Sequence, residues 1–116
     1  ATCLAYKTFG KLTTENVIKG LMLVRDIYRM VVEQELSKHE NIIVEGAFLD
    51  PNSLIKFGKS MLLITSDESK HRRQFLKHRE KLLDIHEDEF KAARIIQNYL
   101  IDEAKVLKIE IIDNPT

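Results

Sequence analysis

Two short apolar runs interrupt a chain whose other apolar residues mostly recur at helical spacing. The segments Asn41–Val44 and Met61–Ile64 show no alternation of apolar and polar residues. This pattern predicts strands that are buried on both faces of a parallel sheet. Lys108–Ile112 is a third segment rich in β-branched residues, and it predicts a strand that ends at Asp113-Asn114-Pro115.

Two helices are predicted before the second of these strands. Thr13 is a candidate N-cap, and the apolar residues that follow it recur every three or four positions, which predicts a helix to about Lys38. Asp50 suits the N-cap of a short second helix, with Pro51 at its first position. Gly58 is expected to end this helix.

Two further helices are predicted between the second and third strands. The first extends from Asp67 to about Lys81 and has few apolar residues, so little of its surface is suited to packing. The second begins near Glu87. Its predicted buried stripe consists of Phe90, Ala93, Ile96, Leu100, Ala104 and Leu107.

This order of elements predicts an α/β fold of three layers, with a small parallel sheet of about three strands and helices on both faces. Helices between consecutive strands require crossover connections, which make the strands parallel. A chain of 116 residues is expected to form one domain over residues 1–116. A three-stranded sheet leaves two edges, and one is expected to receive either a missing strand or a second copy of the chain.

Composition narrows the classes of partner. The formal net charge is zero, which argues against nucleic acid and against an anionic membrane as partners, because both are usually bound by an excess of Lys and Arg. Cys3 is the single cysteine, so an internal disulfide cannot form and a cytoplasmic location is expected. No apolar run approaches the roughly 20 residues of a membrane span.

Candidate ligand-binding residues follow two of the predicted strands. Glu45 comes directly after Asn41–Val44, and the carboxyl ends of parallel strands face the crevice where open α/β sheets bind ligands. Asp113 follows the last strand and would share that rim with Thr65 if the strands are parallel. The four histidines lack the spacing of a helical metal pair, so no metal site is predicted.

The helix from Asp67 carries a run of basic residues. Arg72, Arg79 and Arg73 are candidates for the forked donors that bind phosphate oxygens. The alternative is a solvated basic face, balanced by the acidic residues between 84 and 89.

Gly58-Lys59-Ser60 resembles the end of a phosphate-binding P-loop, but the context argues against one. The full pattern requires glycine five residues before the second glycine, and that position is Ser53. A P-loop also follows a strand and precedes a helix, whereas here the predicted helix comes first and the strand second.

Several segments together resemble the C-terminal part of 2-phosphoglycerate kinases, which are P-loop kinases of the adenylate-kinase-like type. The similarity covers most of the chain in one unbroken order. The segments are Ala5-Tyr6-Lys7, Asn41-Ile-Ile-Val-Glu-Gly46, Pro51, Ser66-Asp67-Glu68 with His71-Arg72, Phe75 and Arg79, Ile96-Gln97-Asn98-Tyr99-Leu100 and Ile111-Ile-Asp-Asn114.

The resemblance implies phosphoryl transfer from ATP, with Mg²⁺, to a small phosphorylated acid. It places Glu45 near the metal and the acceptor, as a catalytic residue. It places Arg72 and Arg79 on a lid that binds phosphate, where Arg73 is a further candidate. Asp113 and Asn114 fall on the nucleotide-side rim.

The sequence also departs from the family pattern. The chain contains no P-loop, so we expect that loop to lie upstream of Ala1 and the chain to be inactive without it. Phe48 stands where the family usually has histidine, and Gln74 stands where it often has arginine before the lid phenylalanine.

Three hypotheses follow from the sequence. The first is that the chain is the C-terminal portion of a 2-phosphoglycerate-kinase-like enzyme, which contributes the lid and the acceptor side. The second is a non-catalytic module that binds a phosphorylated metabolite. The third is an oligomerisation domain without a ligand.

Overall fold

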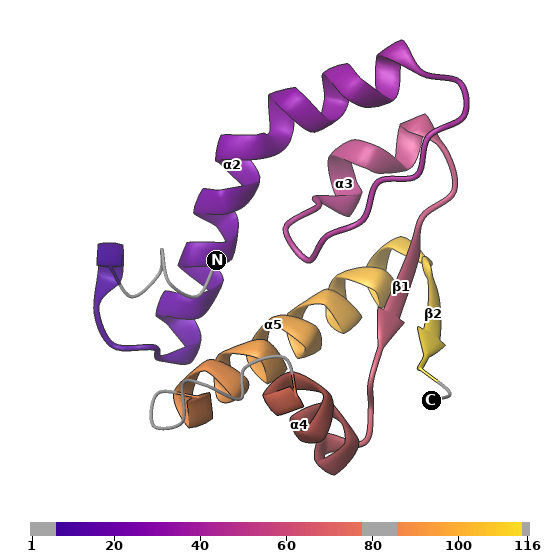
Figure 1. The fold of residues 1–116 in the computed structure, drawn as a ribbon. Coiled ribbons are helices and arrows are strands. Elements are labelled where there is room, and N and C mark those ends of the chain that lie inside the picture. Colours follow the sequence, from indigo (N-terminus) through magenta and orange to yellow (C-terminus); the bar gives the residue numbers. More distant parts are fainter. Residues whose placement is uncertain (1–6, 78–85, 115–116) are drawn as a thin grey trace.

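The computed structural model describes residues 7–77 and 86–114, and it shows a mixed α/β chain that is mostly helical (Figure 1). Two parallel strands lie against one face of a long helix, α5, and the helix α2 packs on α5 away from the strands. The elements in chain order are α2 (Thr14–Lys38), α3 (Pro51–Leu54), the 3₁₀ helix η1 (Ile55–Phe57), β1 (Met61–Ile64), α4 (Glu68–Lys77), α5 (His86–Leu107) and β2 (Glu110–Asp113).

The predicted helix starts are confirmed at both N-caps. The Thr13 hydroxyl accepts a hydrogen bond from the backbone N–H of Asn16 at 3.2 Å. The Asp50 carboxylate accepts one from the N–H of Asn52 at 3.0 Å, and Pro51 occupies the first helical position. Each cap satisfies an N–H group that has no partner within its helix.

The sheet consists of β1 and β2, which pair in parallel with Met61 opposite Glu110 and Ile64 opposite Asp113. The connection between them contains α4 and α5, as expected for a parallel crossover. Burial alternates along β1, since Met61 and Leu63 are 59% and 66% exposed while Leu62 and Ile64 are half-buried. The expectation that both faces of this strand are buried is therefore wrong.

The strand predicted at Asn41–Val44 is not formed. This segment is irregular, and Ile43 is 93% exposed. A buried parallel strand needs a hydrogen-bonded neighbour and helices over its faces, and in the described part of the chain the sheet stops at β1 and β2. The prediction of a third strand here is wrong, and the arrangement with helices on both faces is not confirmed.

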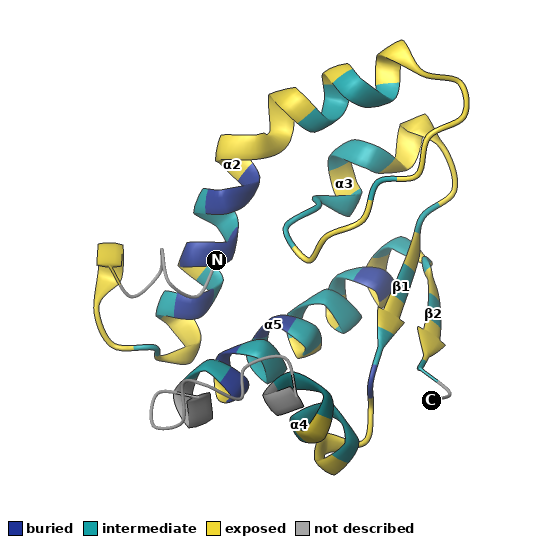
Figure 2. Cartoon of the chain, in the orientation of Figure 1, coloured by how far each residue is buried: buried dark blue, intermediate teal, exposed yellow. Residues whose placement is uncertain are grey.

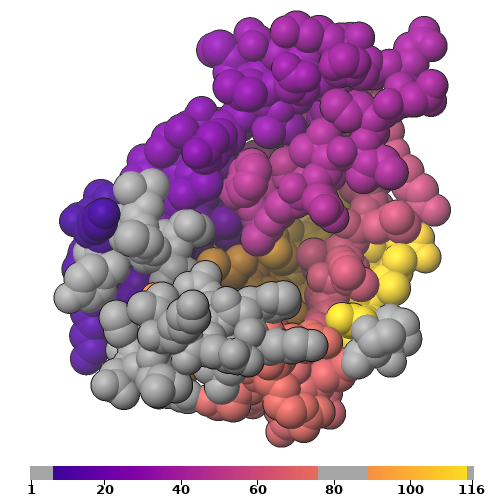
Figure 3. Space-filling view, in the orientation of Figure 1, coloured from indigo at the N-terminus to yellow at the C-terminus, as the bar shows by residue number. Residues whose placement is uncertain are grey.

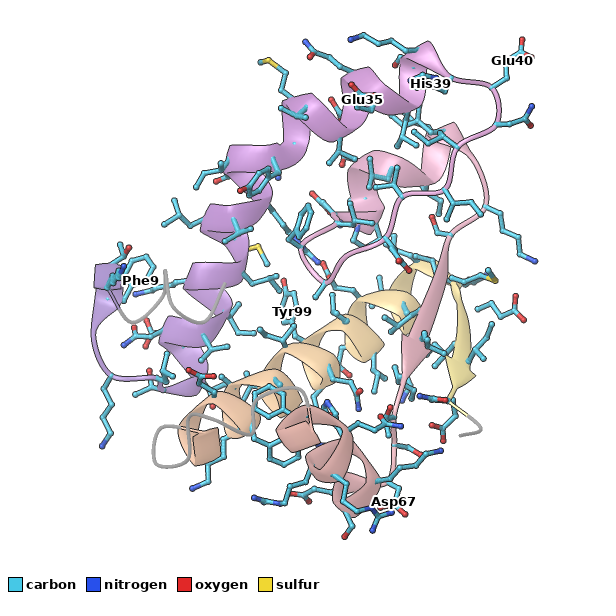
Figure 4. All side chains as sticks on the ribbon, in the orientation of Figure 1. Phe9, Glu35, His39, Glu40, Asp67 and Tyr99 are labelled. Atoms are coloured by element: carbon cyan, nitrogen blue, oxygen red, sulfur yellow. The ribbon has the colours of Figure 1, made fainter. Side chains whose placement is uncertain are left out.

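The core lies where the first half of α2 meets α5. Val17 and Leu21 from α2 pack with Ala92 and Ile96 from α5, and both helices are coloured as buried along these stretches in Figure 2. The partly buried side chain of Tyr99 packs against this cluster, between the two helices (Figure 4). The second half of α2 is largely exposed, and it forms a lobe at one end of the molecule together with the loop that follows it (Figure 3).

A buried ion pair joins α2 to α5 beyond this core. Arg25 is 3% exposed, and its guanidinium donates two hydrogen bonds to the carboxylate of Glu103, at 2.9 and 2.6 Å. Asp50, the cap of α3, lies 4.0 Å from the same guanidinium and 3.3 Å from that of Arg29. Burial acts to lower the pKa of Arg25, but the hydrogen bond and charge of Glu103 outweigh it and raise that pKa.

The burial of Arg25 is not evident from the sequence. Its position in the sequence is that of a charged residue beside an apolar stripe, and the carboxylates that pair with it lie 25 and 78 residues away along the chain.

No helix in the described part of the chain is both long and apolar enough to cross a membrane.

Glu103→Ala is expected to destabilise the fold by about 3–5 kcal/mol, because it leaves the buried charge of Arg25 without its bidentate partner. Urea unfolding followed by circular dichroism measures this change. Glu15→Ala is the matched control, since Glu15 pairs with Lys19 on the exposed surface of the same helix. Equal effects of the two substitutions would contradict the structural role of the buried pair.

Candidate functional site

The carboxyl ends of β1 and β2 meet at one edge of the sheet, as the sequence predicted for parallel strands. The backbone N–H of Ser66 donates to Asp113 Oδ1 at 3.0 Å, and the Ser66 hydroxyl donates to Asp113 Oδ2. Asp113 thus closes the turn that leads from β1 to α4. We call residues Thr65–Asp67 the β1–α4 turn.

The side chain of Asp113 is occupied by this contact. The hydrogen bonds from Ser66 hold the pKa of the Asp113 carboxyl below its usual range, and the charge of Lys70 acts in the same direction. A carboxylate that already accepts two hydrogen bonds from the turn has less capacity for a ligand. Asp113 therefore lies at the carboxyl end of β2, beside the turn that follows β1, where it has a structural role.

Two polar side chains of α5 hold the β1–α4 turn from the other side. Gln97 forms a pair of hydrogen bonds with the backbone of Thr65, since its Oε1 accepts from the N–H and its Nε2 donates to the C=O, both at 3.0 Å. Arg94 donates to the C=O of Thr65 at 2.8 Å and to that of Ser66 at 3.4 Å. The turn is therefore fixed by its backbone.

The first turn of α4 begins at this edge. Asp67 caps the helix, because its carboxylate accepts a hydrogen bond from the N–H of Lys70 at 3.0 Å (Figure 4). The Lys70 ammonium donates to the C=O of Asn114 at 2.7 Å. Asn114, which was predicted on the nucleotide-side rim, therefore lies beside α4 at the end of β2.

The arginines predicted to bind phosphate have different environments. The guanidinium of Arg72, a residue of α4, lies 4.6 Å from the centre of the Phe90 ring of α5. This cation–π contact holds the Arg72 side chain against α5. Arg73 is exposed. Arg79 lies outside the described residues. Of the basic residues of α4 and α5, Lys70 and Arg94 contact the edge directly, through the carbonyls of Asn114, Thr65 and Ser66.

Phe90 is the apolar anchor of α4. It is 1% exposed, and the rings of Phe75 and His71 lie 5.7 and 5.1 Å from it. These contacts compensate for the few apolar residues of α4.

Glu45, the predicted catalytic residue, does not lie at this edge as a strand end. It is exposed on the irregular segment that replaces the predicted strand. The structure therefore brings Asp113 and Asn114 together with the start of α4 but does not bring Glu45 to them. Among the described residues, no group of three or more His, Cys, Asp and Glu side chains is arranged to hold a metal ion.

Arg94 and Gln97, which hold the β1–α4 turn, were not candidates from the sequence. Both lie at helical spacing from Phe90, on the face that the apolar stripe was expected to occupy. Polar residues at buried positions of a stripe signal hydrogen-bonding partners, because a buried polar group without one is costly. The presence of Arg94 and Gln97 on this face of the helix is therefore the feature of the sequence that could have indicated their hydrogen bonds.

No protein family, curated protein or solved structure matches this chain. The resemblance to 2-phosphoglycerate kinases therefore rests on the sequence segments alone.

Ser66→Ala is expected to raise the pKa of Asp113 toward its ordinary value, because the variant lacks the hydroxyl donor that stabilises the carboxylate. Carboxyl-detected NMR titration measures this pKa in both proteins. A depressed pKa means that the contact stabilises the fold above about pH 4 and that this contribution is lost as the pH falls through the folded pKa. Ser69→Ala, an exposed serine in the first turn of α4, should leave the titration unchanged. An unaltered pKa in Ser66→Ala would contradict the assigned contact.

Proposed function

We propose that this chain contributes the lid and the acceptor side of ATP-dependent phosphoryl transfer to a small phosphorylated acid, in a protein resembling 2-phosphoglycerate kinase. The observation that carries the proposal is the start of a basic helix at the carboxyl edge of a parallel sheet. Ligands of open α/β sheets bind at this edge. In this proposal the complete enzyme binds ATP and Mg²⁺ and is located in the cytoplasm.

The chemistry of α4 suits a phosphorylated ligand. Phosphoryl transfer depends on positioning and on neutralising the charge of the transferring group, and guanidinium groups supply both. Arg72 is held on Phe90, and Arg73 extends from the neighbouring position of the same helix. A helix fixed at its first turn by Asp67 and Lys70 can carry these groups toward a ligand at the edge.

The exposed edge and face of β1 are consistent with a sheet that has further strands in the complete enzyme. Ile64 directs its C=O toward β2, where it accepts a hydrogen bond from Asn114 at 2.7 Å. Because alternate residues of a parallel strand face opposite neighbours, the N–H and C=O of Leu63 face the free edge of β1. A further parallel strand would pair there and bring helical cover for Met61 and Leu63.

The segment Asn41–Val44 is a candidate for this further strand. Its composition is that of a buried strand, yet it lacks a neighbour in the described sheet. In the proposed complete enzyme this segment joins the sheet, and Glu45 then reaches the carboxyl edge as a catalytic residue. Arg79 completes the lid, and Asp113 and Asn114 remain on the nucleotide-side rim.

An oligomerisation module is the second candidate, and the exposed apolar face of β1 favours it. Met61 and Leu63 are exposed together with Ile112 of β2, and such a face is also suited to a second copy of the chain. This candidate predicts a dimer and no phosphorylated ligand.

Binding of 2-phosphoglycerate to the chain is expected to fall about tenfold in Arg73→Ala and in Arg72→Ala, since each loses a charge-assisted hydrogen bond to phosphate. Isothermal titration calorimetry at two salt concentrations measures it, and binding should weaken at the higher salt. Lys105→Ala is the control, because it removes a positive charge from the last turn of α5. ATP with Mg²⁺ is titrated separately.

The outcomes separate the candidates. Loss in the arginine variants but not in the control supports the lid. Absence of binding, combined with a dimer in sedimentation experiments, would favour oligomerisation instead. Equal loss in all three variants would show only a general charge effect and would contradict a defined phosphate site.

A further inference from the structure

Arg94 lies at the junction of the elements that the proposed site uses. Its guanidinium comes from α5 and reaches three acceptors, which are the carbonyls of Thr65 and Ser66 and the ring nitrogen Nδ1 of His71, at 3.3 Å. The first two belong to the β1–α4 turn and the third belongs to α4. One side chain thus connects α5, the turn and the basic helix.

The contact with His71 is possible in only one protonation state. Arginine is always a donor, so Nδ1 must carry a lone pair, and the neutral ring must hold its proton on Nε2. A protonated imidazole has donors at both nitrogens and a positive charge, and it would face the guanidinium as a second cation. His71 is also stacked edge-on against Phe90, so it cannot turn toward water without leaving this ring.

We propose that Arg94 is a positioning residue and that, with neutral His71, it forms a proton-sensitive latch that holds α4 to α5 and to the β1–α4 turn. Protonation of His71 replaces the hydrogen bond with a repulsion between two cations and releases the start of α4. The latch concerns the fold of the chain itself. Its consequence for phosphate, which is a pH-dependent placement of Arg72 and Arg73, rests on the proposed function.

The surroundings of His71 favour the neutral ring. Burial lowers the pKa of His71 below its ordinary value, and the charge of Arg94 lowers it further. The described charged residues on the elements around this contact are Asp67 in the turn, Glu68, Lys70, Arg72 and Arg73 on α4, Glu89, Lys91, Arg94, Asp102, Glu103 and Lys105 on α5, and Glu110 and Asp113 on β2. Among them, Arg94 is the charge that acts on the pKa of His71.

The direction of the pH effect follows from that shift. A histidine whose pKa is lower in the folded chain than in the unfolded chain contributes stability above about pH 6.5. This contribution is lost as the pH falls through the folded pKa, because the unfolded chain then binds more protons. The latch is therefore closed at neutral pH and opens in acid.

NMR titration of the whole chain between pH 8 and pH 5 tests the latch without any ligand. The imidazole ¹⁵N shifts of His71 should identify the Nε2–H tautomer at pH 8. The backbone amide signals of Ser66, Lys70 and Arg72 should then move together with the protonation of His71, with a midpoint below 6.5. Because no ligand is present, failure of the proposed function leaves this result unaffected.

His71→Gln is expected to abolish the concerted movement, because an amide does not take up a proton in this range. His39→Gln is the matched control, since His39 is an exposed histidine beside Glu35 on α2 (Figure 4). It should keep the movement at these amides. Arg94→Lys should shift the same amide signals at every pH, since lysine lacks the forked donors that reach three acceptors.

Several results would overturn the latch. One is the Nδ1–H tautomer of His71 at pH 8. Another is a set of amide signals that do not respond to pH in the unaltered chain. A third is the same pH response in His71→Gln. Circular dichroism of each variant at pH 8 establishes whether it is folded. If a variant does not fold, the tautomer of His71 in the unaltered chain decides the proposal.

Discussion

The fold depends on polar side chains of α5, which form hydrogen bonds with α2 on one side of this helix and with the end of β1 on the other. Toward α2, Glu103 neutralises Arg25, whose buried charge is costly to the fold without a carboxylate partner. Toward the sheet, Gln97 satisfies the N–H and C=O of Thr65 where β1 ends. Apolar packing brings the elements together, but these directional contacts fix where α2 and the β1–α4 turn lie along α5.

This arrangement explains why hydrogen bonds hold the carboxyl edge of the sheet, where both strands end, whereas the side of β1 away from β2 has no strand beside it in the described part of the chain. Contacts from Gln97, Arg94 and Asp113 converge on the β1–α4 turn, so the start of α4 has a defined position beside β2. On one face of β1, Met61 and Leu63 are exposed. The proposed function assigns the carboxyl edge to ligand binding and the side of β1 away from β2 to another strand.

Local rules predicted much of the fold. The N-caps Thr13 and Asp50, the short helix after Pro51 and the long helix near residue 87 follow from side chains within a few positions of each other. Asn41–Val44 has the composition of a buried strand but lacks neighbours, and composition alone does not supply them. Of the candidate site, the meeting of Asp113 with the turn was predictable from parallel strands. The roles of Arg94, Gln97 and Arg25 were not, because their partners are distant in sequence.

The free edge of β1 is the central claim, and the hydrogen exchange of the Leu63 amide tests it most directly. The account predicts that this amide exchanges rapidly in the isolated chain, because it faces the side of β1 where no strand lies among residues 7–77 and 86–114. The amides of Leu62 and Ile64, which face β2, should exchange slowly. Slow exchange at Leu63, equal to that of its neighbours, would contradict the account, because it would show that the edge is already paired.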